Sequence, residues 1–354
     1  MTIITTQANT ESNEIKLTQF TTGGGCGCKI SPEILDKIVN RQFQSEIFPS
    51  LLVGNKSNDD AAVFEIDNQN CIISTTDFFT PIVDDPATFG SISSVNAISD
   101  IYAMGGEPLL AIAILGWPIN KIEPSVASKV LEGSRKICAS VSIPLAGGHS
   151  IDCPEPIFGL AVTGKVKKSC LKRNNTSVVG SLLYLTKPIG VGIITTAQKK
   201  GIVNNEHLEV ATNSMLTLNK IGATFGNLKY VNALTDVTGF GLLGHLIEMC
   251  EGSNLSAEIE FNKVPKFDFL YEYIQQNSTP GGTARNWKSY GHKIGGLGDL
   301  NHSILADPQT SGGLLVSVDF EHSSNFETVC LKAGFALKPF GRMIPKKEKA
   351  VYVS

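Results

Sequence analysis

Apolar and polar positions alternate in short segments along this chain, and the segments predict strands mixed with helices. Strands over Ala61–Ile66 and Cys71–Thr75 flank four polar residues, 67–70, which is typical of a β-hairpin. A longer segment predicts a helix from about Pro86 to Met104, which ends at two glycines. The same reasoning predicts three further elements: a strand over Leu109–Leu115, a helix over Glu123–Ser140 and a strand over Phe158–Val166.

The pattern starts again after the polar and basic stretch Lys167–Gly180, where we place a domain boundary. The chain then divides into a tail, arm and first helix (1–50), an N-terminal domain (51–167) and a C-terminal α+β domain (168–354). Mixed strands and helices indicate α/β or α+β layers around a sheet. The second half predicts these elements: strands over Ser181–Thr186 and Leu314–Val318, and helices near Gly192–Lys200 and Leu242–Cys250.

The composition indicates which kinds of molecule this protein is expected to bind. With 354 residues, 42% hydrophobic and 18% charged, the chain can bury the cores of two domains. A net charge of −3 gives no broad attraction to nucleic acid or anionic membrane, so we expect a small-molecule partner held by local groups. No stretch approaches the ~20 apolar residues of a membrane span, and polar Met1–Asn13 predicts a disordered tail rather than a signal peptide. Eight scattered cysteines favour reduced thiols, and we expect a cytoplasmic protein.

One segment, residues 23–29, has the sequence Gly-Gly-Gly-Cys-Gly-Cys-Lys. It is too rich in glycine for a hydrophobic core, which indicates a functional role. A thiolate beside an ammonium group has a lowered pKa, so Cys26 near Lys29 would be a nucleophile near neutral pH. The glycines favour a mobile arm that buries little of its own surface and can approach a ligand closely. Ser31-Pro32-Glu33 then predicts the start of a helix with one apolar stripe: Ile34, Leu35, Ile38 and Val39.

Other interpretations of this arm are weaker. A P-loop would need a final glycine where Cys28 stands and Ser or Thr where Ile30 stands. A zinc site would need a second Cys or His pair at short spacing, which the sequence lacks. A disulfide between Cys26 and Cys28 would close a small, strained ring. A transient disulfide formed in a redox reaction is conceivable there, but a permanent one that stabilises the fold is not. An unused flexible arm stays open on these residues alone.

Four aspartates are further candidates for a functional role: Asp60, Asp77, Asp100 and Asp236. Each lies among apolar residues at an element boundary or in a helical turn, where a lone carboxylate is unfavourable unless it is hydrogen-bonded or bound to a cation. If they converge, hard oxygen ligands without nearby His or Cys favour Mg²⁺. The alternative is that each caps a turn or a helix. Asp100 and Asp236 end similar segments, 96–100 and 232–236, which are either a faint internal repeat or a coincidence.

Two further glycine-rich segments have the form of phosphate-binding loops. They are Gly147–Ser150 and the stretch 238–245, which opens a helix. A glycine before a helix is more often only a turn, so each is weak evidence alone. We expect His245 to be a packed core histidine and His149 to be the better functional candidate.

Taken together, these segments resemble the selenide, water dikinases, or selenophosphate synthetases. The resemblance covers about residues 15–354, and its Cys-Gly-Cys-Lys arm is specific within a wider superfamily. It implies a two-domain aminoimidazole-ribonucleotide-synthetase-like α+β fold with a flexible Gly-rich N-terminal arm. The segments that carry the resemblance are 24–32, Gly54–Asn55 leading to 59–63, 74–79, 96–106, 146–152, 234–245 and 307–313.

The resemblance implies a cytoplasmic homodimer that converts ATP, selenide and water to selenophosphate, AMP and orthophosphate, with Mg²⁺ as cofactor. This product would supply selenium for selenocysteine and selenouridine synthesis. A potassium requirement and a selenium-delivery protein stay open. A kinase of the same superfamily or a catalytically silent nucleotide-binding regulator remains the alternative, but the former is not expected to carry this arm and the latter would be expected to lose Cys26.

By matched position, the resemblance assigns roles to individual residues. Cys26 would handle selenium, and Lys29 would be the essential charge beside it. Mg²⁺ would be held by Asp60, Asp100 and Asp236. ATP would be surrounded by Lys29, Ser57, Asn58, Asp59, Asp77 and Asp100, and by Gly148, His149 and Ser150 from the dimer partner. The stretch Thr21–Gly23 departs from the shared pattern, and Cys153 has no assigned role beyond that of a buried thiol.

Overall fold

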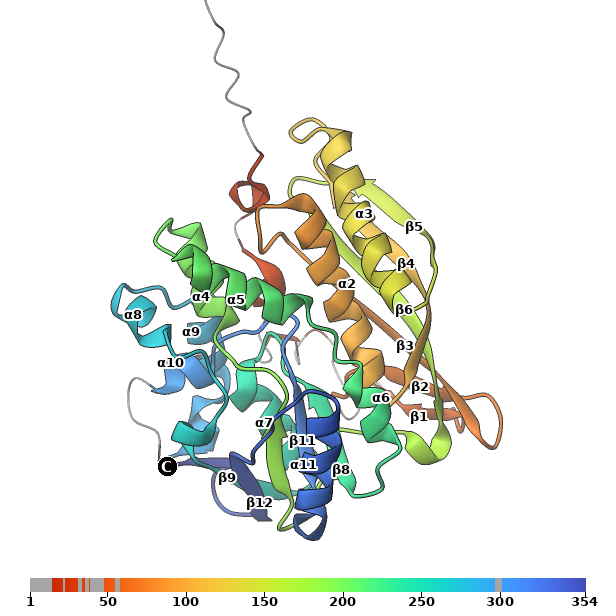
Figure 1. Ribbon diagram of the computed structural model, residues 1–354, viewed down its shortest axis with the longest axis vertical. Coiled ribbons are helices and arrows are strands. Elements are labelled where there is room, and N and C mark those ends of the chain that lie inside the picture. The colour runs from red at the N-terminus through yellow and green to blue at the C-terminus, as the bar shows by residue number, and fades with distance from the viewer. Residues whose placement is uncertain are drawn as a thin grey trace, which may run out of the picture.

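The computed structural model describes residues 15–21, 23–30, 34–35, 38, 48–54, 58–296 and 301–354. Two sheets organise these residues, one in each half of the chain (Figure 1). The polar tail Met1–Asn13, the expected helix start Ser31–Glu33 and the candidate Ser57 lie outside the described residues. Within the described ranges, none of the helices has the length and hydropathy that a transmembrane span requires.

The first sheet has six strands in the order β1-β2-β3-β6-β4-β5. All neighbours are antiparallel except β4 and β5. Along β3, exposed and buried residues alternate, so Cys71, Ile73 and Phe79 face the core. The strands are β1 (Leu51–Val53), β2 (Ala62–Glu65), β3 (Asn70–Phe79), β4 (Glu107–Trp117), β5 (Leu145–Asp152) and β6 (Ile157–Lys167).

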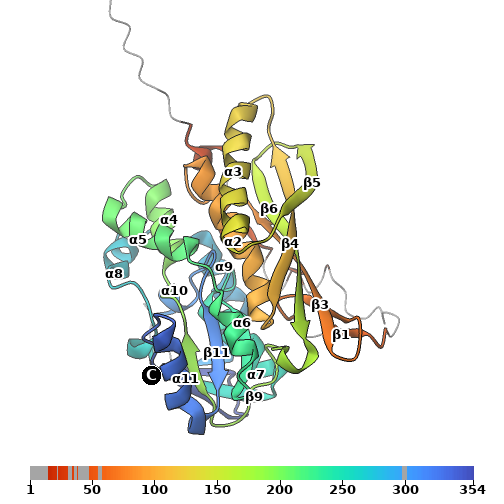
Figure 2. The ribbon, with the colours of Figure 1, turned by 45° about the vertical axis from the view of Figure 1, so that its right-hand side comes forward.

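Helices α2 (Pro86–Ala103) and α3 (Pro124–Ser140) cover one face of this sheet (Figure 2). Asp85 caps α2 by accepting the Thr88 amide, and Pro86 occupies its first turn. The two helices approach closely, because a Cβ on Gly90 would lie 1.9 Å from the Val130 carbonyl oxygen. On its other side α2 contacts the second half of the chain, which explains why it is buried nearly all round.

The second sheet has seven strands in the order β10-β13-β9-β12-β7-β11-β8. Its strands are β7 (Leu182–Leu185), β8 (Val231–Asp236), β9 (Leu255–Ile259), β10 (Ile294–Gly295), β11 (Leu314–Val318), β12 (Gly341–Pro345) and β13 (Val351–Val353). The helices of this half are α4 (Val191–Lys199), α5 (Asn205–Leu216), α6 (Ile221–Gly226), α7 (Gly241–Gly252), α8 (Leu270–Gln275), α9 (Gly281–Tyr290), α10 (Asn301–Leu305) and α11 (Ser323–Lys332). Helices α5 and α6 and strand β8 contact α2, so the two halves meet along that helix (Figure 1).

One sequence prediction about an element is wrong, and one question that the sequence left open is answered. The segment Gly147–Ser150 is part of edge strand β5 rather than a loop. Glycine is needed there because a Cβ on Gly148 would lie 2.2 Å from the Ala113 carbonyl oxygen on β4. Residues 96–100 lie in α2 whereas 232–236 lie in β8, so their similar sequences are no structural repeat.

The arm buries more surface than expected. Gly25–Cys28 form a 3₁₀ turn, Gly25 donates its amide to the Thr80 carbonyl, and Cys26 is 0% exposed. The expectation that this arm buries little of its own surface is therefore wrong.

Candidate functional site

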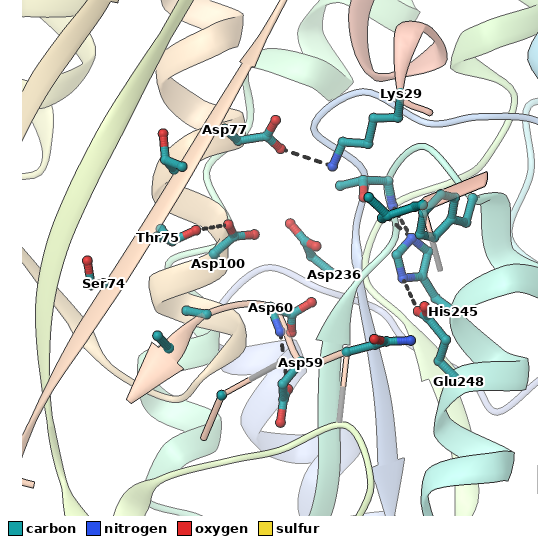
Figure 3. Close-up of a pocket in the computed structure, with 18 residues that line it drawn as sticks. Lys29, Asp59, Asp60, Ser74, Thr75, Asp77, Asp100, Asp236, His245 and Glu248 are labelled. Carbon is teal, nitrogen blue, oxygen red and sulfur yellow. Dashed lines mark hydrogen bonds and ion pairs between the residues drawn. The ribbon is translucent and has the colours of Figure 1, made fainter. Parts of the chain in front are cut away.

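A cavity of about 490 Å³ lies where α2, the first sheet and the second half of the chain meet (Figure 3). We call it the acidic cavity. Its lining comes from the arm through Lys29, from residues 58–62, from β3 through 74–77, from α2 through Asp100, and from β8 and α7. Six of its lining residues are acids: Asp59, Asp60, Asp77, Asp100, Asp236 and Glu248.

Three aspartates from separate elements converge in this cavity. Asp60 lies just before β2, Asp100 in α2, and Asp236 at the end of β8. One carboxylate oxygen of each lies within 4.8 Å of those of the other two. The predicted convergence of these three carboxylates is therefore confirmed, and we call them the acidic triad.

Threonine hydroxyl groups hold two carboxylates of the triad. Thr235 Oγ1 donates to Asp60 Oδ1 over 2.7 Å, and Thr75 Oγ1 donates to Asp100 Oδ2. The second oxygens of Asp60 and Asp236 are buried and have no hydrogen-bond partner among the described residues. Each such oxygen is unfavourable unless a cation or proton satisfies it.

The surroundings also make the triad hard to ionise. Burial, followed by repulsion from Asp236, raises the pKa of both Asp60 and Asp100 well above the usual range. Burial raises the pKa of Asp236 as well, against the effect of Ser99. Converging carboxylates with unsatisfied oxygens and raised pKa values fit a hard divalent cation that takes oxygen ligands.

Asp77 does not join the triad. Its Oδ2 accepts the Lys29 ammonium over 3.3 Å and the Asn96 side-chain amide over 2.7 Å (Figure 3). Burial alone would lower the pKa of Lys29, but Asp77 and the other nearby acids outweigh it and raise that pKa, so Lys29 is charged. Asp77 therefore pairs with Lys29 and lines the acidic cavity without being part of the triad.

Cys26 is buried and does not line the acidic cavity, and residues from both halves of the chain hold it. Its amide donates to Thr310 Oγ1 over 2.9 Å, and its Sγ donates to Asn96 Oδ1 over 3.3 Å. Burial, followed by the charge of Asp77, raises the pKa of Cys26 well above the usual thiol range despite Lys29. In this arrangement Cys26 is a protonated thiol, so the predicted activation by the nearby lysine is wrong.

Sequence reasoning gave no role to Asn96 or to the loop 308–313. Asn96 is 0% exposed and bonds Cys26, Asp77 and the Ser311 amide at once. Ser311 has a φ of 51°, an unusual backbone conformation for a residue with a side chain. A polar residue in the middle of a buried helix and a Gly-rich loop after a proline were the available signals.

The remaining candidates lie in different places. Asp59 accepts the amides of Asp60 and Asn174, and burial raises its pKa to about 6. Asn58 lines the same cavity. Gly148, His149 and Ser150 are exposed on β5 and are not among the described residues that line the cavity.

The other predicted single residues have mixed outcomes. His245 is buried, as predicted, but it also lines the acidic cavity; its Nε2 accepts the Thr238 amide and its Nδ1 contacts Glu248. Cys153 is only half-buried, so it is not the buried thiol that was expected.

Comparisons with known proteins agree with this architecture. The family model for AIR synthase related protein, N-terminal domain, matches residues 58–166, and the C-terminal domain model matches 178–354. The thiamine-monophosphate kinase structure from Stenotrophomonas maltophilia K279a has a TM-score of 0.64 at 17% identity, covering 91% of this chain and 95% of that one. The HypE–HypF complex structure gives 0.66 at 13% identity, covering 91% and 95%. These matches confirm the expected two-domain fold.

Sequence relatives are far more similar. Selenide, water dikinase of Colwellia psychrerythraea is 56% identical over 330 residues, which cover 93% of this chain and 96% of that protein. Selenide, water dikinase of Pseudomonas putida is 54% identical over 342 residues, covering 97% and 99%. At this identity over nearly the full length, the chain belongs to the selenide, water dikinase family.

Proposed function

We propose that the protein is a selenophosphate synthetase that converts ATP, selenide and water to selenophosphate, AMP and orthophosphate. Family membership supports the reaction class. The structural observation that carries the proposal is one cavity lined by the acidic triad and by Lys29 of the arm, next to a very small cavity that Lys29 and Cys26 both line. A polyphosphate needs positive charge, which Lys29 and a cation held by the triad would provide here.

Mg²⁺ is the cation we propose for Asp60, Asp100 and Asp236. The unpartnered oxygens and the hydroxyl groups that fix the other oxygens support this assignment. When bound, Mg²⁺ neutralises charge that develops on transferring phosphoryl groups. Without it, the buried carboxylates would repel the nucleotide.

ATP would occupy the acidic cavity, whose volume is within the range of small-molecule sites. We propose that Asn58, Asp59, Asp77 and Asp100 surround it, together with Ser57. Lys29 would contact a phosphate, since its compact ammonium is a strong point charge. Because Lys29 is bound to Asp77 in this structure, nucleotide binding would exchange or share that contact.

Cys26 would handle selenium on the same arm. Its thiol is buried and protonated here, so we infer that the arm shifts before Cys26 meets its substrate. The shift would break the contacts of Cys26 with Thr310 and Asn96. Closure afterwards would exclude bulk water from the reacting groups.

We also propose a cytoplasmic homodimer formed through the open face of the first sheet. That face carries a group of exposed apolar side chains, which supports an interface: Phe64, Phe78, Leu110, Ile112 and Ile151. Edge strand β5, with Gly148, His149 and Ser150, borders the same face. A second copy could thus bring His149 to the partner's nucleotide. Analytical ultracentrifugation would test it: we expect a dimer that Ile112→Lys dissociates.

Nucleotide analysis tests the proposed reaction. Anaerobic incubation with ATP, Mg²⁺ and selenide should yield AMP, and AMP formation should depend on selenide. A kinase of the same fold would give ADP instead. ADP as the sole product, with or without selenide, would therefore overturn the proposal.

A further inference from the structure

A second cavity of about 500 Å³ lies against the arm. Its lining includes Gly23, Gly24, Gly27 and Cys28 of the arm, the strand end at Thr80, and residues of α4 and α9. It shares no lining residue with the acidic cavity among those described. The arm thus lines two separate cavities, and nothing in the proposed nucleotide site uses the second.

The two cavities have opposite charge. Lys199 and Arg285 line the second cavity, and Glu155 is the one acid among its described lining residues. Six acids line the nucleotide cavity beside Lys29 and His245. Basic residues outnumber the acid in the second cavity, whereas acids outnumber basic residues in the first, so the side chains of the second cavity favour a small anion more than those of the first do.

Polar groups in the second cavity are available to such an anion. Thr80 is 9% exposed, and its Oγ1 has no hydrogen-bond partner among the described residues. Helix α9 begins at Gly281 beside the cavity with no side-chain cap, so its first amides add donors. Arg285 uses Nη2 to bind the Gly27 carbonyl and keeps further N–H groups.

A very small cavity of about 10 Å³ lies between this site and Cys26. Its lining contains Cys26 itself, shares Gly27, Gly282 and Arg285 with the second cavity, and shares Lys29 and Phe240 with the acidic cavity. This volume is about that of one water-sized sphere. A single heavy atom could pass from one side of the arm to the other next to the thiol after a small shift.

We propose that the second cavity is the entry site for selenium, which binds there as the hydrogen selenide anion and reaches Cys26 from the side opposite the nucleotide. This inference rests on the proposed function. Hydrogen selenide is a monoanion near neutral pH with one heavy atom, and because that atom is larger than a water molecule, the arm beside Cys26 would have to shift to let it pass. Separate entry keeps the anion away from the acids and polyphosphate of the first cavity.

Steady-state kinetics with selenide and ATP varied independently tests the proposal. Thr80→Val removes the unpartnered hydroxyl at constant shape, and Arg285→Gln removes a charge. Each should raise the KM for selenide about tenfold, as expected for loss of a hydrogen bond to a charged group, and leave the KM for ATP within about twofold. Thr80→Ser, which keeps the hydroxyl, and Arg135→Gln, which removes an exposed charge on α3, should behave as wild type.

Unchanged KM for selenide in both Thr80→Val and Arg285→Gln would overturn the entry site. Equal increases in both KM values would also overturn it, because they would indicate a displaced arm. A wild-type protein that makes no AMP would instead refute the proposed function. Crystals soaked anaerobically with sodium hydrogen selenide decide the binding claim independently of turnover. We expect an anomalous selenium peak near Thr80 Oγ1 and Arg285, and its absence contradicts the inference.

Discussion

The acidic triad and Lys29 of the arm line the same cavity, but the polar groups of the triad and of the arm differ greatly in how many hydrogen-bond partners they have. The triad comes from fixed core elements, yet Asp60 and Asp236 each keep a buried oxygen without a partner among the described residues. In the arm, Gly25 and Cys26 both bond through their amides and Lys29 is paired. The triad is therefore preformed to bind a cation, whereas the arm must break hydrogen bonds in order to act.

The arm and the triad therefore have different effects on the stability of the protein. A few hydrogen bonds of about 1 kcal/mol each hold the arm, so opening it is within the range of local unfolding. Buried carboxylates that repel each other destabilise the fold until a cation binds. Changes in the arm should thus mainly affect chemistry, and changes in the triad should affect both stability and cation binding.

The largest expected effect is on the arm. Cys26→Ser should lower selenophosphate formation by about 1000-fold or more, because the change removes the thiol that we propose handles selenium. Nucleotide affinity should stay within about threefold, since Cys26 does not line the acidic cavity. Anaerobic turnover and calorimetric titration with a non-hydrolysable ATP analogue measure the two quantities. Cys170→Ser, at a half-buried thiol that lines neither cavity, is the matched control. Loss of nucleotide binding in Cys26→Ser would contradict the separation of roles.

The second largest effect is expected from a change in the acidic triad. Asp236→Asn should weaken Mg²⁺-dependent nucleotide binding about 100-fold, because one cation ligand loses its charge. The same change should raise the free energy of unfolding without Mg²⁺ by about 1 kcal/mol, since it relieves repulsion between buried carboxylates. Titration and urea unfolding provide the measurements, with exposed Asp268→Asn as control. Lower stability in Asp236→Asn would show that the carboxylate has a structural role.

A smaller effect is expected from the hydroxyl that fixes Asp60. Thr235→Val leaves Asp60 Oδ1 without its donor and should weaken Mg²⁺ binding about three- to tenfold. Mn²⁺ titration followed by electron paramagnetic resonance is a direct readout. Thr235→Ser, which keeps the hydroxyl, should restore the affinity. If it behaves as Thr235→Val does, the hydroxyl is not the group that matters.

The smallest effect concerns pH. The pKa of Asp59 is raised from 3.8 to about 6, and those of the triad are raised too, so the native protein binds protons more tightly than the unfolded chain. Stability without a cation should therefore fall as pH rises from about 4 through about 6 and beyond. Mg²⁺ replaces these protons, so the increase in Tm that it causes should grow by a few degrees between about pH 6 and about pH 8. Scanning calorimetry would contradict this if that increase were independent of pH.

The sequence predicts the acids better than it predicts the thiol. Asp60, Asp100 and Asp236 are recognisable because each interrupts an apolar segment. The chemistry of Cys26 depends on burial and on Asp77, which is 51 residues away in the chain, so the nearby Lys29 was misleading. Local sequence also misassigned Gly147–Ser150, because pairing with β4 overrides the preference of glycine for turns.

Packing in the folded chain also explains why two similar segments adopt different structures. Asn96–Asp100 and Asn232–Asp236 share three of their five residues and adopt a helix and a strand, because packing decides the element where propensity does not. Long elements with clear ends, such as α2 after Asp85-Pro86, follow from sequence alone. Contacts between the arm and the loop at Thr310 need the folded chain.

The most direct test of the central claim is ³¹P NMR of the purified protein with ATP, Mg²⁺ and anaerobic selenide labelled with ⁷⁷Se. The account predicts signals of AMP and orthophosphate together with a new phosphorus resonance split by selenium. ATP that is left intact, or converted only to ADP and orthophosphate without a selenium-coupled signal, would contradict it.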